Sequence, residues 1–297
     1  MSLTGRTVIV TGAGGGLGRT HALFLGGMGA NIVVNDMNGE SAAAVADEVV
    51  AAGGAALAFA GSVTDEARVA AMVDAAMEKW GRIDILVNNA GILRDKTFAK
   101  MDLEDFRQVI DVHLMGSVIC TKAVWEIMRR QQYGRVVMTT SSSGLYGNFG
   151  QSNYGAAKMA LVGLMQTLAL EGEKYNVRVN CLAPTAATQM TGELFSREVL
   201  ERLAPEAVSA GLLALVGENA PTRAILCAGG GRFASANITM TQGVQLGAGD
   251  GVAEKVVEQW DRVCERTGDV VPPYGFAQVE MELASVGLDA VSLLKTG

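Results

Sequence analysis

The sequence has little cysteine, proline, aromatic content or positive charge. Four cysteines are spread over 297 residues, and their spacing fits no metal-ligand pattern, so we expect free thiols in a reducing compartment and no metal site. The formal net charge of −7 argues against the basic face that nucleic-acid binding needs. The chain contains no run of about 18 apolar residues, which predicts no membrane span. With no signal peptide at its start, the sequence predicts a cytoplasmic protein.

Proline (five residues) and aromatic residues (5%) are scarce, whereas glycine is abundant, with 37 residues. The glycines have no three-residue period, which excludes a collagen-like chain. A hydrophobic fraction of 49% excludes disorder, because enough apolar surface can be buried to offset the ordering entropy. The glycines cluster at residues 12–18, 26–29, 229–231 and 243–251, which indicates local tasks for the backbone.

Short β-branched runs alternate with longer amphipathic stretches. We expect strands at 7–10, 31–35, 56–60, 83–87, 135–140 and 177–182, a long helix at 102–130 and a seventh strand near 238–242. Near-continuous apolar strands separated by helices predict an α/β fold with a doubly wound parallel sheet of the Rossmann type. We expect a single cofactor-binding domain over residues 1–250 with a helical C-terminal extension over 251–297, since so short a tail rarely supports its own core.

A glycine-rich turn follows the first expected strand and opens the first helix. In Thr11–Gly18 the backbone can turn tightly, approach a pyrophosphate and present amides at a helix N-terminus. Asp36 ends the second strand eighteen residues after Gly18, where a carboxylate can accept both ribose hydroxyls. The alternative for Asp36 is an ordinary strand-end turn residue. Because a carboxylate would repel a 2′-phosphate, and Arg19 is the only cation near the turn, the sequence favours NAD over NADP.

Three residues further along suit a reaction coupled to proton transfer. Tyr154 and Lys158 are four apart at a helix start and so share one face, and Ser141 follows the fifth strand. A phenol with a pKa near 10 is a poor base, but a neighbouring ammonium and an oxidised nicotinamide would lower that pKa. Ser141 could hold the substrate oxygen. A Tyr-x-x-x-Lys pair alone is more often an ordinary pair on a helix surface. It indicates a catalytic site here because the glycine turn, Asp36 and the Asn88–Gly91 segment precede it in the expected order.

These motifs, with Asn88-Asn89-Ala90-Gly91 after the fourth strand, resemble the short-chain dehydrogenase/reductase family over about residues 5–192. The resemblance implies Tyr154 as acid/base, Lys158 as its pKa-lowering partner and ribose ligand, and Ser141 as substrate orienter. It also implies a homodimer or homotetramer. The cofactor contacts it implies come from Gly12, Gly16, Leu17, Gly18, Asp36, Ser62, Val63, Asn88, Ala90, Gly91, Tyr154, Lys158 and Thr188.

Three runs carry a closer resemblance within this family. Asn88–Lys96, Val112–Gly116 and Tyr146–Gln151 are similar to the (3R)-hydroxyacyl-CoA dehydrogenase units of type 2 peroxisomal multifunctional enzymes, also called 17β-hydroxysteroid dehydrogenases type 4. This implies that the small-molecule substrate is a hydroxyacyl-CoA thioester. Two alternatives remain: a dehydrogenase of steroids or other free secondary alcohols, and a non-catalytic NAD-binding protein.

The chain departs from the broad family pattern at a few positions. His113 stands where an Asn usually holds a relay water, so it is either a catalytic relay member, an adaptable spacer or a satisfied core histidine. Pro184-Thr185 replaces the usual Pro-Gly, and the Asp expected beside the adenine is absent near Ser62. The glycines at 229–231 and 243–251 match no expected family feature.

Overall fold

The computed structural model describes residues 2–186, 198 and 202–288, and the chain divides into two compact units, Met1–Ala236 and Asn237–Gly297. The division falls before residue 237, ahead of the boundary at residue 250 that the sequence favours. The reason is local: Met240 pairs with Val270 in an isolated antiparallel bridge, which ties residues 237–250 to the second unit.

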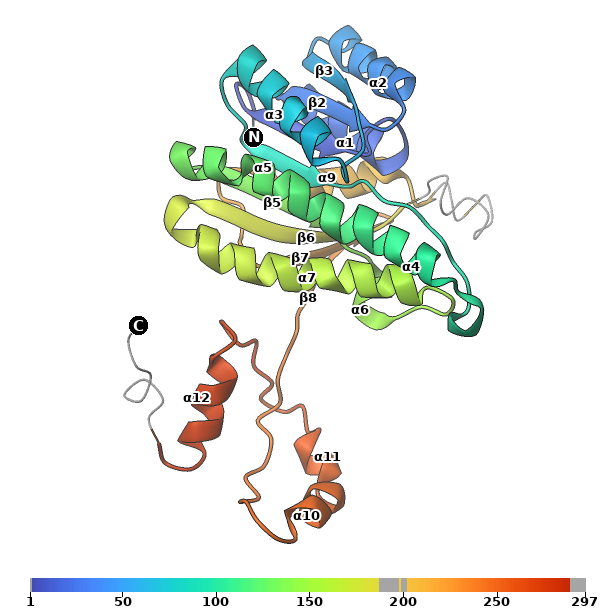
Figure 1. Ribbon diagram of the computed structural model, residues 1–297. Coiled ribbons are helices and arrows are strands. Elements are labelled where there is room, and N and C mark those ends of the chain that lie inside the picture. The colour runs from blue at the N-terminus through green and yellow to red at the C-terminus, as the bar shows by residue number, and fades with distance from the viewer. Residues whose placement is uncertain (1, 187–197, 199–201, 289–297) are drawn as a thin grey trace. The chain divides into compact units, whose positions relative to one another are not determined.

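The first unit is built on one eight-stranded sheet with the order β3-β2-β1-β4-β5-β6-β7-β8 (Figure 1). Every neighbouring pair is parallel except β7 and β8. The chain reverses its direction of sheet growth between β3 and β4, which creates the switch point where open α/β sheets bind ligands. The strands are β1 (Thr7–Thr11), β2 (Asn31–Asp36), β3 (Ala55–Ala60), β4 (Ile85–Asn88), β5 (Gly134–Thr139), β6 (Val177–Thr185), β7 (Ile225–Gly229) and β8 (Arg232–Ala236).

The prediction of a strand near residues 238–242 is wrong, since this segment forms only the isolated Met240–Val270 bridge. The last two strands, β7 and β8, come earlier and form an antiparallel hairpin in which Gly229 pairs with Arg232. Gly230 and Gly231 adopt φ values of 56° and 74°, a left-handed conformation that glycine takes with little cost. The glycine cluster at 229–231 is therefore a hairpin turn.

Helices cover both faces of the sheet and bury two apolar cores. One core includes side chains of α1, α2 and α9, and the other includes side chains of α3, α5 and α7, which lie on the near face in Figure 1. The strands near the middle of the sheet, such as β1, β4 and β5, are buried along their whole length, which explains their near-continuous apolar sequences. The helices are α1 (Gly16–Gly27), α2 (Gly39–Ala51), α3 (Glu66–Trp80), α4 (Leu103–Ile110), α5 (Gly116–Gln131), α6 (Ser142–Tyr146), α7 (Ser152–Gly172) and α9 (Pro205–Val216), with short 3₁₀ turns η1 (Phe98–Lys100) and η3 (Glu173–Tyr175).

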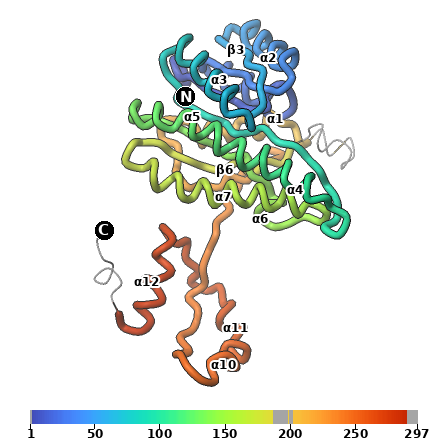
Figure 2. The backbone as a smooth tube through the Cα atoms, viewed as in Figure 1, coloured from blue at the N-terminus to red at the C-terminus, as the bar shows by residue number. Residues whose placement is uncertain are grey.

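The helix expected over residues 102–130 has an irregular turn inside it. A π-helical turn, η2 (Asp111–Met115), joins α4 to α5, and the backbone runs through it as one continuous rod (Figure 2). Such turns widen a helix by one residue and occur often at functional sites. This one carries His113, which is buried.

The second unit contains three short helices, α10 (Val252–Glu258), α11 (Trp260–Val263) and α12 (Ala277–Ala284). Of its described hydrophobic side chains, only Ala277 is buried. In the part of the chain that the structure describes, no helix combines the length and apolar character needed to cross a bilayer.

Candidate active site

The glycine turn lies between β1 and α1, at the carboxyl end of β1. A Cβ on Gly12 would lie 2.7 Å from the Ala90 backbone, and one on Gly18 would lie 2.2 Å from the Gly12 carbonyl oxygen. Gly15 occupies the N-cap position of α1 without a side-chain cap, and Leu17 is buried beneath the turn. The turn therefore has the close-packed, glycine-dependent backbone and amino-terminal amides that suit a pyrophosphate.

Asp36 points back to this turn from the end of β2. Its Oδ2 accepts a hydrogen bond from the Gly14 N–H (2.9 Å), and its Oδ1 accepts one from the Asn38 N–H (2.9 Å). A Cβ on Gly14 would lie 2.8 Å from Asp36 Cγ and equally close to Ser41 Cβ. The carboxylate is thus fixed at the mouth of the turn, where a ribose would fit beside the pyrophosphate.

The segment Asn88–Gly91 is joined to the glycine turn by Asn89, which is part of the sequence motif but is not among the expected cofactor contacts. Asn89 Nδ2 donates to the carbonyl oxygens of Thr11 (2.9 Å) and Gly12 (3.1 Å). Thr11 Oγ1 in turn accepts from the N–H groups of Asn89 (3.0 Å) and Ala90 (3.1 Å). These bonds hold the glycine turn and the Asn88–Gly91 segment together.

The remaining expected cofactor residues take different positions. Asn88 is buried and its Nδ2 donates to Thr121 Oγ1 (3.0 Å), so a cofactor contact would have to come from its main chain. Ser62 Oγ caps its own turn by accepting from the Thr64 N–H (3.2 Å), while Val63 is buried against Gly116. Thr188 lies outside the described residues.

Ser141 and Tyr154 lie at the starts of neighbouring helices. Ser141 is the N-cap of α6, where its Oγ accepts from the Ser143 N–H (3.1 Å), and Tyr154 lies in the first turn of α7. Burial raises the pKa of the Tyr154 phenol, a hydrogen bond with Ser141 lowers it, and the charge of Asp95 raises it again. The net direction is upward, so the protein groups alone do not produce the lowered pKa expected from the sequence.

Lys158 is buried one turn further along α7. Its Nζ donates to the Thr139 carbonyl oxygen at the end of β5 (2.6 Å) and lies 5.4 Å from the centroid of the Tyr154 ring. Thr140 Oγ1 donates to the Lys158 carbonyl oxygen (2.6 Å), which binds the helix to the strand end. Burial lowers the pKa of the Lys158 amine to about 7. The amine therefore changes charge near neutral pH.

His113 packs edge-on against the Tyr154 ring, with centroids 5.2 Å apart. Its Nε2 lies 2.8 Å from the Ile92 carbonyl oxygen and 3.0 Å from the Ile92 N–H, and its Nδ1 is buried without a hydrogen-bond partner. A Cβ on Gly91 would lie 2.3 Å from the imidazole, so the glycine makes room for the ring. Burial, then the charge of Lys158, lower the pKa of His113 to about 3, which keeps the ring neutral.

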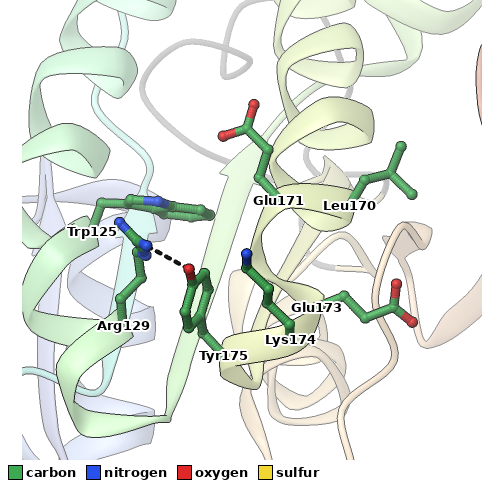
Figure 3. Close-up of a pocket in the computed structure, with 7 residues that line it drawn as sticks. All are labelled: Trp125, Arg129, Leu170, Glu171, Glu173, Lys174 and Tyr175. Atoms are coloured by element: carbon green, nitrogen blue, oxygen red, sulfur yellow. Dashed lines mark hydrogen bonds between the residues drawn. The ribbon is translucent and has the colours of Figure 1, made fainter. Parts of the chain in front are cut away.

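A hollow of about 590 Å³ lies away from these groups, between α5 and the end of α7 with η3 (Figure 3). There Arg129 Nη2 donates to the Tyr175 hydroxyl (2.5 Å), and Trp125 forms part of the wall. None of the residues that line it belongs to the Ser141–Tyr154–Lys158 group. We therefore place the candidate active site at the strand ends. Among the described residues, no group of His, Cys, Asp and Glu could hold a metal ion.

Comparison with known proteins identifies the class. Residues 6–199 match the short chain dehydrogenase family, and the chain belongs to that family of oxidoreductases acting on CH–OH groups. A short-chain type dehydrogenase/reductase of Mycobacterium tuberculosis is 45% identical over 273 residues, which cover 89% of this chain and 95% of that protein. The family membership expected from the sequence is confirmed, and family membership implies a nicotinamide cofactor.

Within this family, the chain is similar to a peroxisomal multifunctional enzyme and to a hydroxysteroid dehydrogenase. The peroxisomal multifunctional enzyme type 2 of Drosophila melanogaster is 47% identical over 214 residues, covering 69% of this chain but 35% of that enzyme. Its full-length structure superposes with a TM-score of 0.82 at 35% identity, covering 100% of this chain and 51% of that one. A 7α-hydroxysteroid dehydrogenase complexed with NADH and 7-oxo glycochenodeoxycholic acid has a TM-score of 0.71 at 30% identity, covering 77% of this chain and 95% of that one. The closer resemblance expected from the sequence is thereby confirmed.

Proposed function

We propose that this protein oxidises a secondary alcohol with NAD, and that its substrate is a (3R)-3-hydroxyacyl-CoA, which becomes the 3-oxoacyl-CoA. The observation that carries the proposal is the packing of Tyr154 edge-on against His113, with the buried Lys158 amine 5.4 Å from the centroid of its ring and Ser141 at the start of the neighbouring helix. This group lies at the same sheet edge as the glycine turn and Asp36.

In the proposed reaction, Ser141, Tyr154 and Lys158 have separate roles in removing the proton of the substrate hydroxyl. When bound, an oxidised nicotinamide would accept a hydride from the carbinol carbon and would add a positive charge near the phenol. Ser141 orients the substrate hydroxyl by hydrogen bonding, and Tyr154 takes its proton. Because burial raises the pKa of Tyr154, positive charge is needed beside it, and Lys158 supplies one when protonated. His113 remains neutral and supports the Tyr154 ring.

NAD is favoured over NADP by two carboxylates near the turn. Asp36 is fixed where a ribose would lie, and it would repel a 2′-phosphate. Arg19, the nearby cation noted in the sequence, is engaged by Glu48, with Arg19 Nε donating to Glu48 Oε1 (3.0 Å). Its guanidinium is therefore already paired.

The thioester substrate is supported by two of the three sequence runs, those around Arg94 and Phe149, and by the likeness to the type 2 multifunctional enzymes. The test is NADH production by the purified protein with (3R)-3-hydroxyacyl-CoA thioesters of several chain lengths, with the 3S isomers as controls. We expect turnover of the 3R series with NAD. Absence of NADH at every chain length would refute the thioester proposal.

A free alcohol is the second candidate. The 7α-hydroxysteroid dehydrogenase that superposes on the chain favours it, because that structure is complexed with NADH and 7-oxo glycochenodeoxycholic acid, which is not a CoA thioester. Comparing kcat/KM for 17β-hydroxysteroids and simple secondary alcohols with that for the thioesters, using both NAD and NADP, separates the two candidates. The homodimer or homotetramer and the cytoplasmic location stay predictions, and light scattering of the purified protein tests the former.

A further inference from the structure

Two of the three sequence runs that carry the closer resemblance, Asn88–Lys96 and Tyr146–Gln151, are hydrogen-bonded to each other. Lys96 N–H donates to the Gly150 carbonyl oxygen (3.0 Å), and Gln151 Nε2 donates to Asp95 Oδ2 (2.6 Å). Asn153 Nδ2 donates to the Arg94 carbonyl oxygen (3.0 Å). We call these three bonds the clamp. They attach the loop after β4 to the segment that leads into α7.

Asn153 connects the clamp to Tyr154 directly. Its side chain is fully buried, and its Oδ1 accepts a hydrogen bond from the Tyr154 N–H (2.7 Å). Both ends of the amide are therefore used, one on the loop and one on the backbone of the adjacent tyrosine. A buried amide with two such partners fixes the position of the chain on either side of it.

Gln151 connects the clamp to Ser141. Its Oε1 accepts from the Ser143 hydroxyl (2.8 Å), and the Ser143 N–H donates to Ser141 Oγ (3.1 Å). The loop after β4 also holds His113, through Ile92. One hydrogen-bonded loop thus reaches Ser141, Tyr154 and His113, although these residues come from three different elements.

We propose that Asn153 and Gln151 are positioning residues, which clamp the start of α7 onto the loop after β4 and so set the Tyr154 hydroxyl against Ser141 and the substrate carbinol. This proposal rests on the function proposed above. Neither residue needs to touch the substrate, since each acts through the placement of Tyr154.

The clamp also fixes a charge near the phenol. The titratable groups that face Tyr154 among the described residues are Asp95 from the loop, His113 from η2 and Lys158 from α7. His113 is neutral, so the competing charges are the Asp95 carboxylate and the Lys158 ammonium. Asp95 raises the pKa of Tyr154, and Gln151 holds that carboxylate in place. The pH profile therefore reports whether the clamp is intact.

The first experiment compares Asn153→Ala with Asn180→Ala. Asn180 is an equally buried asparagine whose Nδ2 donates to the Pro221 carbonyl oxygen (2.7 Å) and whose Oδ1 accepts from the Ala224 N–H (3.0 Å). Both variants lose the same kind of bonds. We expect both to lower Tm, but only Asn153→Ala to reduce kcat, by on the order of 10- to 100-fold, with KM for NAD unchanged. Equal kcat in the two variants would overturn the proposal.

Asn153→Ser covers the case in which the alanine variant does not fold. The shorter serine side chain stays polar and uncharged but cannot span from Tyr154 to Arg94, so we expect a reduced kcat with a smaller loss of Tm than in Asn153→Ala. A wild-type kcat in this variant would count against a clamp that works through the loop.

The second experiment reads the pH profile of kcat/KM. Asp95→Asn removes the charge and can still accept from Gln151, so we expect the rising limb to move to lower pH by on the order of half a unit. Gln151→Ala removes the hydrogen bond to Asp95, so we expect the rising limb of the pH profile to move to lower pH as well, with a lower kcat. The matched control is Gln278→Ala, which removes a similar bond to Glu282 (2.8 Å) in the second unit. A limb that stays fixed in both clamp variants would contradict the proposal.

Amide hydrogen exchange tests the clamp without any substrate. We expect the Tyr154 and Lys96 amides to exchange about tenfold faster in Asn153→Ala than in the wild type, and at the wild-type rate in Asn180→Ala. Unchanged exchange would remove the structural basis of the proposal. If the wild type oxidises no secondary alcohol but the exchange result holds, the proposed function fails while the clamp stands.

Discussion

Lys158 and Tyr154 show how burial changes the chemistry of single residues. Burial lowers the pKa of the lysine to about 7 and raises the pKa of the tyrosine, so both shifts disfavour the charged forms. The sequence placed the two residues on one face of a helix, but it did not show how deeply they are buried. Their acidity therefore depends on the three-dimensional surroundings, including Asp95, which no sequence motif connects with Tyr154.

Tyr154→Phe removes the proposed proton acceptor and keeps the ring that packs on His113. We expect kcat to fall by about 10²- to 10⁴-fold, because a positioned acid or base contributes that much. The Tm and the Kd for NADH, measured by fluorescence titration, should stay close to wild type. Tyr175→Phe, which loses only the hydrogen bond from Arg129, serves as the control. A Tyr154→Phe enzyme with wild-type turnover would mean that another group takes the proton.

Asp36→Ser tests the cofactor preference at the ribose. The substitution removes the negative charge and keeps a small polar side chain, so the ratio of kcat/KM with NAD to that with NADP should fall by about tenfold or more. Steady-state rates with both cofactors measure it. Asp74→Ser, on an exposed position of α3, should leave the ratio unchanged. If both variants behaved alike, Asp36 would not determine the preference.

At the scale of elements, periodicity predicted most helices and strands, because the strands near the middle of the sheet are buried and the helices that cover the sheet pack apolar side chains against it. Periodicity did not predict the β7–β8 hairpin, since β8 is largely exposed and its sequence has no apolar pattern. Gly229–Gly231 carried the signal for its turn. The π-helical turn η2 also escaped, because its sequence continues the helical pattern.

Gly18→Ala tests how tightly α1 is packed on the turn. Its Cβ would lie 2.2 Å from the Gly12 carbonyl oxygen and 2.6 Å from Asn89 Nδ2, so the turn must shift and cofactor affinity should drop by about tenfold or more. Gly27→Ala in the same helix meets nothing within 4 Å and should leave affinity unchanged while preserving or slightly raising Tm. Isothermal titration with NADH measures the difference; similar affinities in the two variants would contradict it.

At the scale of the whole molecule, the first unit encloses two apolar cores and two histidines that are buried and uncharged. The sequence predicted one domain up to about residue 250, but it did not show which polar groups the core of that domain encloses. His21 in α1 is fully buried, with its Nδ1 2.7 Å from Ser209 Oγ in α9, and burial lowers its pKa to about 3.

Because His21 is buried, the free energy of unfolding depends on pH. The folded pKa is about 3 and the ordinary value is 6.5, so between these values the unfolded chain binds more protons and stability falls as pH drops. One such group contributes up to about 1.4 kcal/mol per pH unit. In urea titrations from pH 4 to 6, His21→Leu should flatten the pH dependence of unfolding by that amount. An unchanged slope would show that His21 is protonated in the fold.

The π-helical turn has a consequence for chain length. A turn that spans one extra residue means that the rod from α4 to α5 holds one residue more than a regular α-helix of the same span needs. Deleting Val112 should restore an unbroken α-helix, with circular dichroism close to wild type. Because each residue turns a helix by about 100°, the deletion would rotate His113 away from Tyr154. We expect the variant to fold but to show no NADH production. In η2, the number of residues would then determine the orientation of His113 as much as the residue types do.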